Sequence, residues 1–168
     1  MTSPAVAAHR VSVGIGQIAI SKDPNDVLVS YGLGSCIGVS VFDSQNRIGG
    51  LVHVLLPDSD GKAADPREPA RFADIGVDLL IRMLSEAGAI PRRLVVKIAG
   101  GAAVLGPANA QKFKIGDRNA EAIRERLKRH GLTPAAADVG GTRGRTLEVF
   151  VATGKTFVRT AASPASEL

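Results

Sequence analysis

A single cysteine, Cys36, directly follows a glycine-rich turn, and His53 lies seventeen residues later within an apolar run. A cysteine thiolate is a strong nucleophile, and an adjacent imidazole is a common base for producing it. An unassisted thiol is only a few per cent ionised at neutral pH, so a nucleophilic cysteine needs a neighbour of this kind. These two side chains therefore indicate covalent catalysis by a cysteine.

The spacing of Cys36 and His53 fits a β-hairpin. Residues 36–43 and 48–56 are rich in β-branched residues and flank a short polar segment, which predicts two antiparallel strands. In the register set by a two-residue loop, the cysteine is the direct cross-strand neighbour of the histidine, with Cβ atoms about 5 Å apart. A slip of one residue would place the two side chains on opposite faces. We therefore expect the hairpin to bring them together.

The turn before the cysteine offers donors for a developing oxyanion. Gly32 and Gly34 allow positive φ angles and leave backbone N–H groups uncovered, so the amides of Gly34, Ser35 or Cys36 are candidate oxyanion donors. A further hydrogen-bonding group that holds the imidazole would complete a triad. The residues themselves leave several candidates for this group: Ser30, Ser35, Asp26 and Asp58.

Other interpretations of these residues compete with catalysis. A single cysteine on a strand is often a small buried hydrophobic side chain. The glycine turn could also bind phosphate, but no Lys-Ser/Thr pair follows it and the next element is predicted to be a strand. One cysteine and one nearby histidine leave a metal site short of ligands. We expect neither a metal nor a cofactor.

Length and composition predict one aliphatic core. The chain has 168 residues, the size of an ordinary domain, so we expect a single domain over residues 1–168. Hydrophobic residues make up 45% of the chain and aromatic residues only 4%, so Val, Ile, Leu and Ala must build the interior. Residues 1–9 and 160–168 are small or polar, and we expect them to be flexible tails.

Charge and targeting signals restrict the partners. The net charge of +5 suits an acidic partner. A basic cluster at residues 124–129 lies on a predicted helix without interleaved aromatic residues, so no nucleic-acid partner is expected. We find no signal peptide or membrane-spanning run and expect no membrane insertion. A solitary cysteine cannot form an intramolecular disulfide, and a reducing cytoplasm is the expected compartment.

The rest of the sequence predicts an α+β fold. Apolar residues recur at helical spacing from Ala70 to Ala87, and Asp117 or Asn119 is expected to cap a second helix. His130 is placed in the last turn of that helix, where a structural role is expected. Besides the hairpin, strands are expected at residues 10–21, 27–31, 94–99, 134–138, 146–151 and 155–159. This order predicts mixed sheets covered by two helices.

Several stretches together resemble the CheD family of chemoreceptor glutamine deamidases, from Val13 to Arg159. The matching stretches are GIGQ at 14–17, LGSC at 33–36, GGLVHVLLPDS at 49–59, RFAD at 71–74, VKIAGGA at 96–102, IGDRNAEAIRERL at 115–127 and DVGGTRGR at 138–145. The resemblance implies that Cys36 of LGSC is the nucleophile and that His53 of the HxxLP motif is its base. The third residue of the triad in that family is a threonine six residues before the cysteine. Ser30 occupies this position here, and it keeps the hydroxyl but loses the methyl group that fixes the rotamer of a threonine.

The resemblance also implies a reaction, a fold and partners. The reaction is hydrolysis of glutamine side-chain amides on methyl-accepting chemoreceptors through a cysteine thioester, without a cofactor. The implied fold is an α/β/β/α sandwich shared with cysteine deamidases of the toxin type, and the implied partners are the cytoplasmic helices of chemoreceptors and a CheC-like phosphatase. Two alternatives stay open: a non-catalytic adaptor that binds receptors or such a phosphatase, and a cysteine amidase that acts on another protein.

Overall fold

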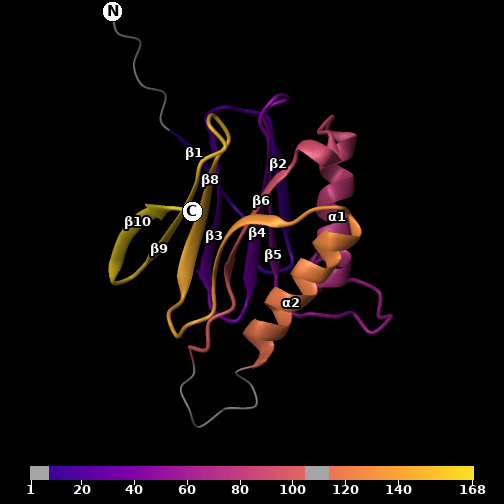
Figure 1. Cartoon of the computed structure of the whole chain (residues 1–168), viewed down its shortest axis with the longest axis vertical. Coiled ribbons are helices and arrows are strands. Elements are labelled where there is room, and N and C mark those ends of the chain that lie inside the picture. Colours follow the sequence, from indigo (N-terminus) through magenta and orange to yellow (C-terminus); the bar gives the residue numbers. More distant parts are fainter. Residues whose placement is uncertain (1–7, 105–113) are drawn as a thin grey trace, which may run out of the picture.

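The computed structural model describes residues 8–104 and 114–168, which form two sheets and two helices (Figure 1). In chain order the elements are β1 (His9–Ser12), β2 (Ile18–Ser21), β3 (Asp26–Leu33), β4 (Ile37–Asp43), β5 (Ile48–Val54), α1 (Ala73–Glu86), the short 3-10 helix η1 (Pro91–Arg93), β6 (Val95–Gly100), α2 (Lys114–Arg129), β7 (Pro134–Val139), β8 (Arg145–Phe150), β9 (Thr156–Thr160) and β10 (Ser163–Glu167).

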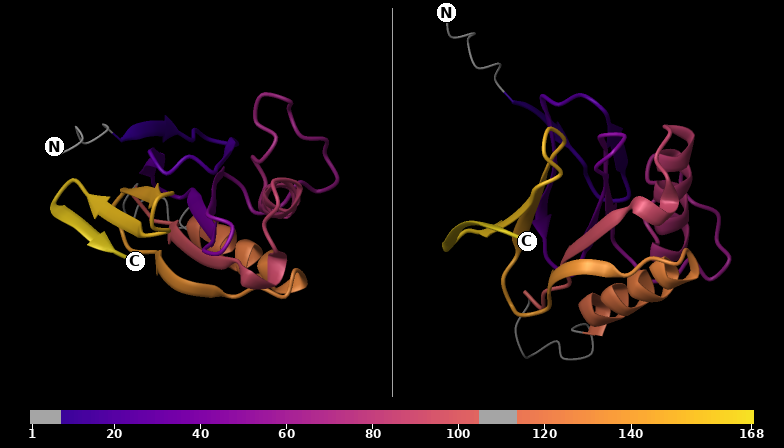
Figure 2. Two further views of the ribbon diagram at one scale, coloured as in Figure 1. Left: turned by 90° about the horizontal axis from the view of Figure 1, so that it is seen from above. Right: turned by 45° about the horizontal axis from the view of Figure 1, so that its top comes forward.

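The strands form two mixed sheets of five strands each. The central sheet has the order β2-β5-β4-β6-β7, and the outer sheet has the order β1-β3-β8-β9-β10. The β1–β3 and β6–β7 pairs are parallel, whereas the other neighbours are antiparallel. The central sheet lies between the outer sheet and the helices, as the views of Figures 1 and 2 agree.

Aliphatic side chains fill the space on both faces of the central sheet. One buried cluster joins the helices to this sheet and includes Leu80 and Leu84 of α1 and Ile123 of α2. The other cluster lies between the two sheets and includes Leu51 of β5 and Leu147 of β8. Because both faces of β4 and β5 are covered, every residue of these two strands is buried. The central hairpin is therefore the most enclosed part of the fold.

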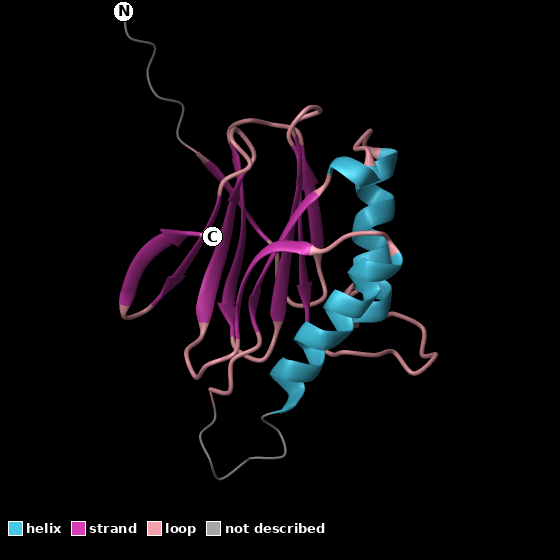
Figure 3. Cartoon of the chain, viewed as in Figure 1, coloured by secondary structure: helices cyan, strands magenta, loops and turns pink. Residues whose placement is uncertain are grey.

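The predicted α+β sandwich of mixed sheets with covering helices is confirmed, with one difference in layering. Both helices pack on the same face of the central sheet, which gives three layers instead of the expected four (Figure 3). Ala120, Ile123 and Leu127 form the buried face of α2, and they join the cluster that already contains α1. Within residues 8–104 and 114–168, no helix has the length and apolar character needed to span a bilayer.

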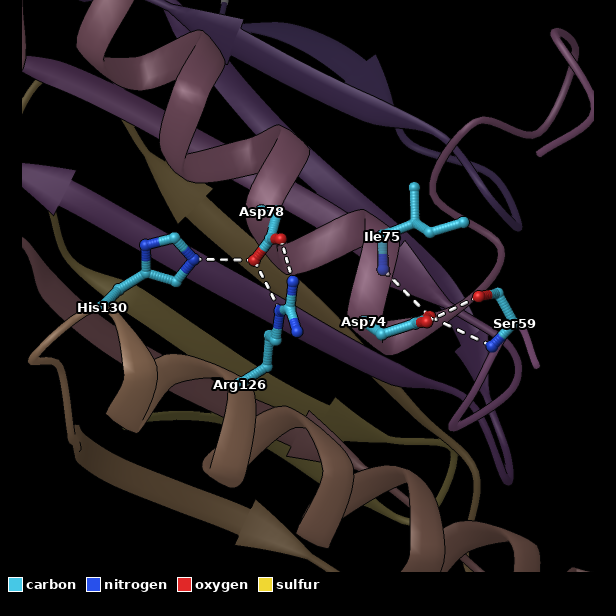
Figure 4. A network of polar contacts seen from close by, with 6 residues as sticks. All are labelled: Ser59, Asp74, Ile75, Asp78, Arg126 and His130. Carbon is cyan, nitrogen blue, oxygen red and sulfur yellow. Dashed lines mark hydrogen bonds and ion pairs between the residues drawn. The ribbon is translucent and has the colours of Figure 1, made fainter. Parts of the chain in front are cut away.

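Ionic contacts fix α2 against α1 (Figure 4). The guanidinium of Arg126 donates two hydrogen bonds to the carboxylate of Asp78, which lowers the pKa of Asp78. His130 contacts the same carboxylate, with its Nε2 2.7 Å from Oδ1. His130 therefore helps to hold α2 against α1, which is consistent with the structural role expected for it.

The predicted strand at residues 10–21 is wrong as a single element. β1 belongs to the outer sheet and β2 to the central sheet, so the chain crosses between the sheets at residues 13–17. Gly16 has a φ angle of +72°, and a Cβ there would meet Glu68 at 2.5 Å. The chain bends at Gly16, where it crosses between the sheets.

The expected helix cap and the expected C-terminal tail also differ from the structure. α2 begins at Lys114, so Asp117 lies in its first turn and Asn119 lies on its buried face instead of capping it. The segment 160–168, predicted to be a flexible tail, contains β10, which pairs with β9. Of the other expected tail, residues 1–7 lie outside the described residues and His9 begins β1.

The end of β6 approaches the backbone of the turn at residues 34–36 closely. Gly100 has a φ angle of +122°, and a Cβ at this position would overlap the carbonyl oxygen of Cys36. The next amide, of Gly101, donates a 2.8 Å hydrogen bond to that oxygen. This contact requires a residue without a side chain at position 100.

Replacing Gly100 by alanine should destabilise the fold more than the same change at Gly131. Gly131 also has a positive φ of +71°, but no atom of the described residues lies within 4 Å of where its Cβ would stand, so Gly131→Ala should cost only the backbone strain of about 1–2 kcal/mol. Gly100→Ala adds a clash with main chain, which should cost about 1–3 kcal/mol more. Urea unfolding of both variants measures the difference, and equal losses would contradict the close approach.

Candidate active site

The register of the β4–β5 hairpin places Cys36 and His53 diagonally across from each other. Gly38 is the direct partner of His53, so the expected pairing of Cys36 with His53 is wrong by two positions. A shift of this size keeps both residues on the same face, at a typical diagonal Cα separation of about 7–8 Å. That face is the one between the sheets, where Cys36 packs in the cluster with Leu51.

The difference in register comes from the turn. Asp43 pairs with Ile48, so the loop contains four residues instead of two. The buried carboxylate of Asp43 accepts hydrogen bonds from the backbone N–H groups of Gln45 and Asn46 at 3.0 and 3.1 Å, and from that of Ile90 at 2.9 Å. These bonds satisfy the amides of a longer turn, which the polar composition of the loop did not reveal.

His53 is buried and held by a main-chain carbonyl. The ring is 2% exposed, and its Nδ1 lies 3.1 Å from the carbonyl oxygen of Val13. A carbonyl can only accept a hydrogen bond, so Nδ1 must carry a proton, and in the neutral ring Nε2 then carries the lone pair. Nε2 is buried and has no hydrogen-bond partner among the described residues. This is the tautomer that a general base needs.

The segment that crosses between the sheets also fixes the backbone of His53. The N–H of Gly16 donates to the carbonyl of His53 at 2.8 Å, and the N–H of His53 donates to the carbonyl of Gln17 at 3.1 Å. The same segment supplies the Val13 carbonyl to the ring. Residues 13–17 therefore hold the histidine through both its backbone and its side chain.

Ser30 contacts the same carbonyl as His53. It is fully buried on β3, and its Oγ donates a 3.2 Å hydrogen bond to the carbonyl oxygen of Val13. The hydroxyl makes no hydrogen bond to the imidazole, so its link to His53 passes through the shared oxygen of Val13. Ser30 and His53 come from different sheets and meet at this one acceptor.

Backbone contacts fix the turn that carries the nucleophile. The carbonyl of Gly34 accepts a 2.7 Å hydrogen bond from the N–H of Ala102, and the carbonyl of Cys36 accepts one from Gly101. Among residues 8–104 and 114–168, we find no acceptor for the N–H groups of Gly34 and Ser35. Two of the three amides predicted as oxyanion donors, those of Gly34 and Ser35, are thus free of partners within that part of the chain.

Burial opposes charge on both catalytic candidates. Burial raises the pKa of the Cys36 thiol above its ordinary value, an effect partly offset by the residue's own backbone N–H. Burial also lowers the pKa of His53 below its ordinary value, and the Val13 carbonyl offsets part of that shift. The resting pair is therefore a neutral thiol and a neutral imidazole.

The two aspartates that were candidates for the third residue of the triad lie away from His53. Asp26 accepts a hydrogen bond from Ser21 and pairs with His9 at the start of β3. Asp58 lines a polar pocket beside Arg126 and Arg129 near the helices. The Val13 carbonyl was missed at the level of sequence, since no side-chain pattern can reveal it.

Comparisons with known proteins agree with these motifs. The family described as CheD chemotactic sensory transduction matches residues 55–160. The probable chemoreceptor glutamine deamidase CheD of Symbiobacterium thermophilum is 44% identical over 158 residues, which cover 94% of this chain and 96% of that protein. The chemoreceptor glutamine deamidase CheD of Thermotoga maritima is 42% identical over 147 residues, covering 88% of this chain and 89% of that protein.

A solved structure gives a more distant likeness. The hypothetical protein YfiH of Bacillus licheniformis matches with a TM-score of 0.45 and 12% identity, covering 81% of this chain and 60% of that chain, which is too distant to support an argument. The family match and the two relatives span most of the described fold, and the relatives cover about nine-tenths of the chain. The chain belongs to the CheD family.

Proposed function

We propose that this chain hydrolyses glutamine side-chain amides of methyl-accepting chemoreceptors to glutamate, with Cys36 as the nucleophile and His53 as the base. The observation that carries this proposal is the position of His53 on the same face as Cys36, with Nδ1 bonded to Val13 and Nε2 free to accept a proton. The names of the family relatives supply the substrate class.

The reaction begins from the neutral pair. As Sγ of Cys36 attacks the carboxamide carbon of the substrate, Nε2 of His53 accepts the thiol proton. The carboxamide oxygen becomes an oxyanion, which accepts hydrogen bonds from backbone amides of the turn at Gly34, Ser35 and Cys36. The imidazolium then donates its proton to the departing nitrogen, ammonia leaves, and a thioester joins the substrate to Cys36.

Water completes the reaction without a cofactor. Nε2 of His53 accepts a proton from a water molecule, whose oxygen attacks the thioester carbon. The second tetrahedral intermediate collapses, the C–S bond breaks, and the proton on the imidazole returns to the sulfur. The products are glutamate and the original thiol. Throughout, the bond from Nδ1 to the Val13 carbonyl holds the ring and stabilises its cationic form.

Ser30 acts in this scheme as a positioning residue. Its hydroxyl shares the Val13 oxygen with His53, so it fixes the acceptor that orients the ring. The partners proposed for the reaction are the cytoplasmic helices of chemoreceptors, and the cytoplasm keeps the solitary thiol reduced. A CheC-like phosphatase as a second partner belongs to the competing adaptor function, in which the fold binds receptors or the phosphatase without chemistry.

The first test is conversion of receptor glutamines by the wild-type chain and by Cys36→Ala. Each deamidation adds about one dalton, so mass spectrometry of a receptor cytoplasmic fragment gives the rate for each glutamine. We expect Cys36→Ala to lower the rate about a thousandfold or more because no nucleophile remains. If the variant converts glutamines at the wild-type rate, the proposed enzyme is wrong. If neither protein converts receptor glutamines but both bind the fragment, the adaptor function is favoured.

A pair of serine variants tests the positioning role of Ser30. Ser30 and Ser40 are both buried, and each Oγ donates a 3.2 Å hydrogen bond to a carbonyl oxygen, of Val13 and Lys97 respectively. Both alanine variants should lose similar stability, but Ser30→Ala alone should lower kcat, by about threefold to tenfold. Ser30→Thr, which keeps the hydroxyl, should retain activity. Equal kcat values for Ser30→Ala and Ser40→Ala would show that Ser30 has no positioning role.

The neutral resting pair predicts the pH dependence of thiol alkylation. Because burial raises the pKa of Cys36, the rate of alkylation by iodoacetamide should rise with pH to values above 9.0, without a plateau near neutral pH. A preformed thiolate–imidazolium pair would instead give a rate that is already constant near neutral pH. Rates followed by mass spectrometry on the free chain distinguish the two cases, with Cys36→Ala as the blank.

A further inference from the structure

Asn119 of α2 connects the backbone segments that carry the two catalytic side chains. Its side chain is fully buried, and Nδ2 donates hydrogen bonds of 2.9 Å to the carbonyl of Ser35 and 2.9 Å to the carbonyl of Leu55. Ser35 immediately precedes Cys36, and Leu55 lies two residues after His53. One amide group therefore spans the start of β4 and the end of β5.

The orientation of this amide is determined by its partners. Both partner atoms are carbonyl oxygens, which only accept hydrogen bonds, so the nitrogen of the Asn119 amide must face them. Its Oδ1 is buried and has no hydrogen-bond partner among the described residues. Asparagine is also a poor helix former in the middle of a helix. Packing and helix stability alone would favour an apolar residue at this position.

The bond to Ser35 fixes the peptide that precedes the nucleophile. In a trans peptide, the carbonyl of one residue and the N–H of the next point in opposite directions. The Ser35 carbonyl points toward α2, because it accepts the hydrogen bond of Asn119. The N–H of Cys36 therefore points away from α2, toward the space between the sheets. The Cys36 side chain packs in that same space.

The neighbouring peptides are held in the same manner. Ala102 binds the Gly34 carbonyl and Gly101 binds the Cys36 carbonyl, so three successive carbonyls each accept an external N–H. Two of these donors are main-chain groups that any sequence would retain. Asn119 is the side-chain donor in this set, and it holds the central peptide.

We propose that Asn119 is a positioning residue for the deamidation, which fixes the Ser35–Cys36 peptide so that the Cys36 N–H points at the oxyanion. The proposal rests on the proposed function, because the oxyanion forms only if Cys36 attacks an amide. Asn119 touches neither the substrate nor the sulfur, and it acts through the backbone. Its second bond, to Leu55, keeps this peptide in register with the strand that carries His53.

Two variants of Asn119 and one control test this role. Asn119→Ala removes both hydrogen bonds, and Asn119→Leu removes them while filling the space with a better helix former. Ile123→Ala is the control, because Ile123 is also fully buried on α2, one turn later, but contacts the aliphatic core. Each variant is assayed on the receptor fragment below its unfolding temperature.

Both Asn119 variants should lower kcat by about tenfold to about a hundredfold, with KM changed less than about twofold, because an oxyanion donor acts in the transition state. Ile123→Ala should keep kcat within about twofold of wild type even if it loses more stability. A wild-type kcat in Asn119→Leu overturns the proposal, and so does an equal loss of kcat in Ile123→Ala at matched stability.

Alkylation of Cys36 tests the peptide orientation without a receptor. If the Cys36 N–H loses its fixed direction, its dipole no longer faces the space that holds the thiolate, and the pH midpoint of alkylation by iodoacetamide should rise in both Asn119 variants but not in Ile123→Ala. An unchanged midpoint in Asn119→Leu overturns the proposal. A wild-type chain that alkylates as expected but converts no glutamine refutes the proposed function alone, since the midpoint shift still reports the orientation of the peptide.

Discussion

The carbonyl oxygen of Val13 accepts hydrogen bonds from His53 and Ser30, and the geometry of the site depends on this one acceptor. It requires Nδ1 of His53 to be protonated, which leaves the lone pair on Nε2. Val13 is held in turn by its N–H, which donates to the carbonyl of Val29 at 2.7 Å. A main-chain oxygen fixed in this way has no rotamers, so the orientation of the ring depends on the fold itself.

The layered fold makes this contact possible because three different segments meet between the sheets. His53 comes from the central sheet, Ser30 from the outer sheet, and Val13 from the segment that crosses between them. The helices lie on the opposite face of the central sheet, where α2 reaches the turn at residues 34–36 through its buried Asn119. His53 is thus held from one side of the central sheet and the turn that precedes Cys36 from the other.

The sequence predicts the hairpin, the shared face of Cys36 and His53, and the mixed sheets with helices. These features depend on strong local signals: β-branched strands, a polar turn and helical periodicity. The rest depends on contacts that residue types do not reveal. The register differs because the Asp43 carboxylate builds a four-residue turn and also binds a distant backbone N–H. The acceptor at Val13 is a backbone atom, so its residue type carries no information about its role. Asparagine favours a helix cap, but α2 starts five residues before Asn119 and turns this side chain inward.

Burial of Cys36 and His53 affects the selectivity of the proposed reaction. A permanently ionised thiolate would react with many electrophiles, whereas in the proposed reaction the buried Cys36 thiol transfers its proton to His53 at the moment of attack. That proton transfer becomes favourable when the sulfur attacks a carboxamide carbon and the backbone amides of the turn stabilise the carboxamide oxygen. The same burial that opposes charge at rest also strengthens those hydrogen bonds during the reaction, because water is excluded. In the proposed reaction, Cys36 is therefore activated by a substrate whose oxygen reaches the amides of the turn.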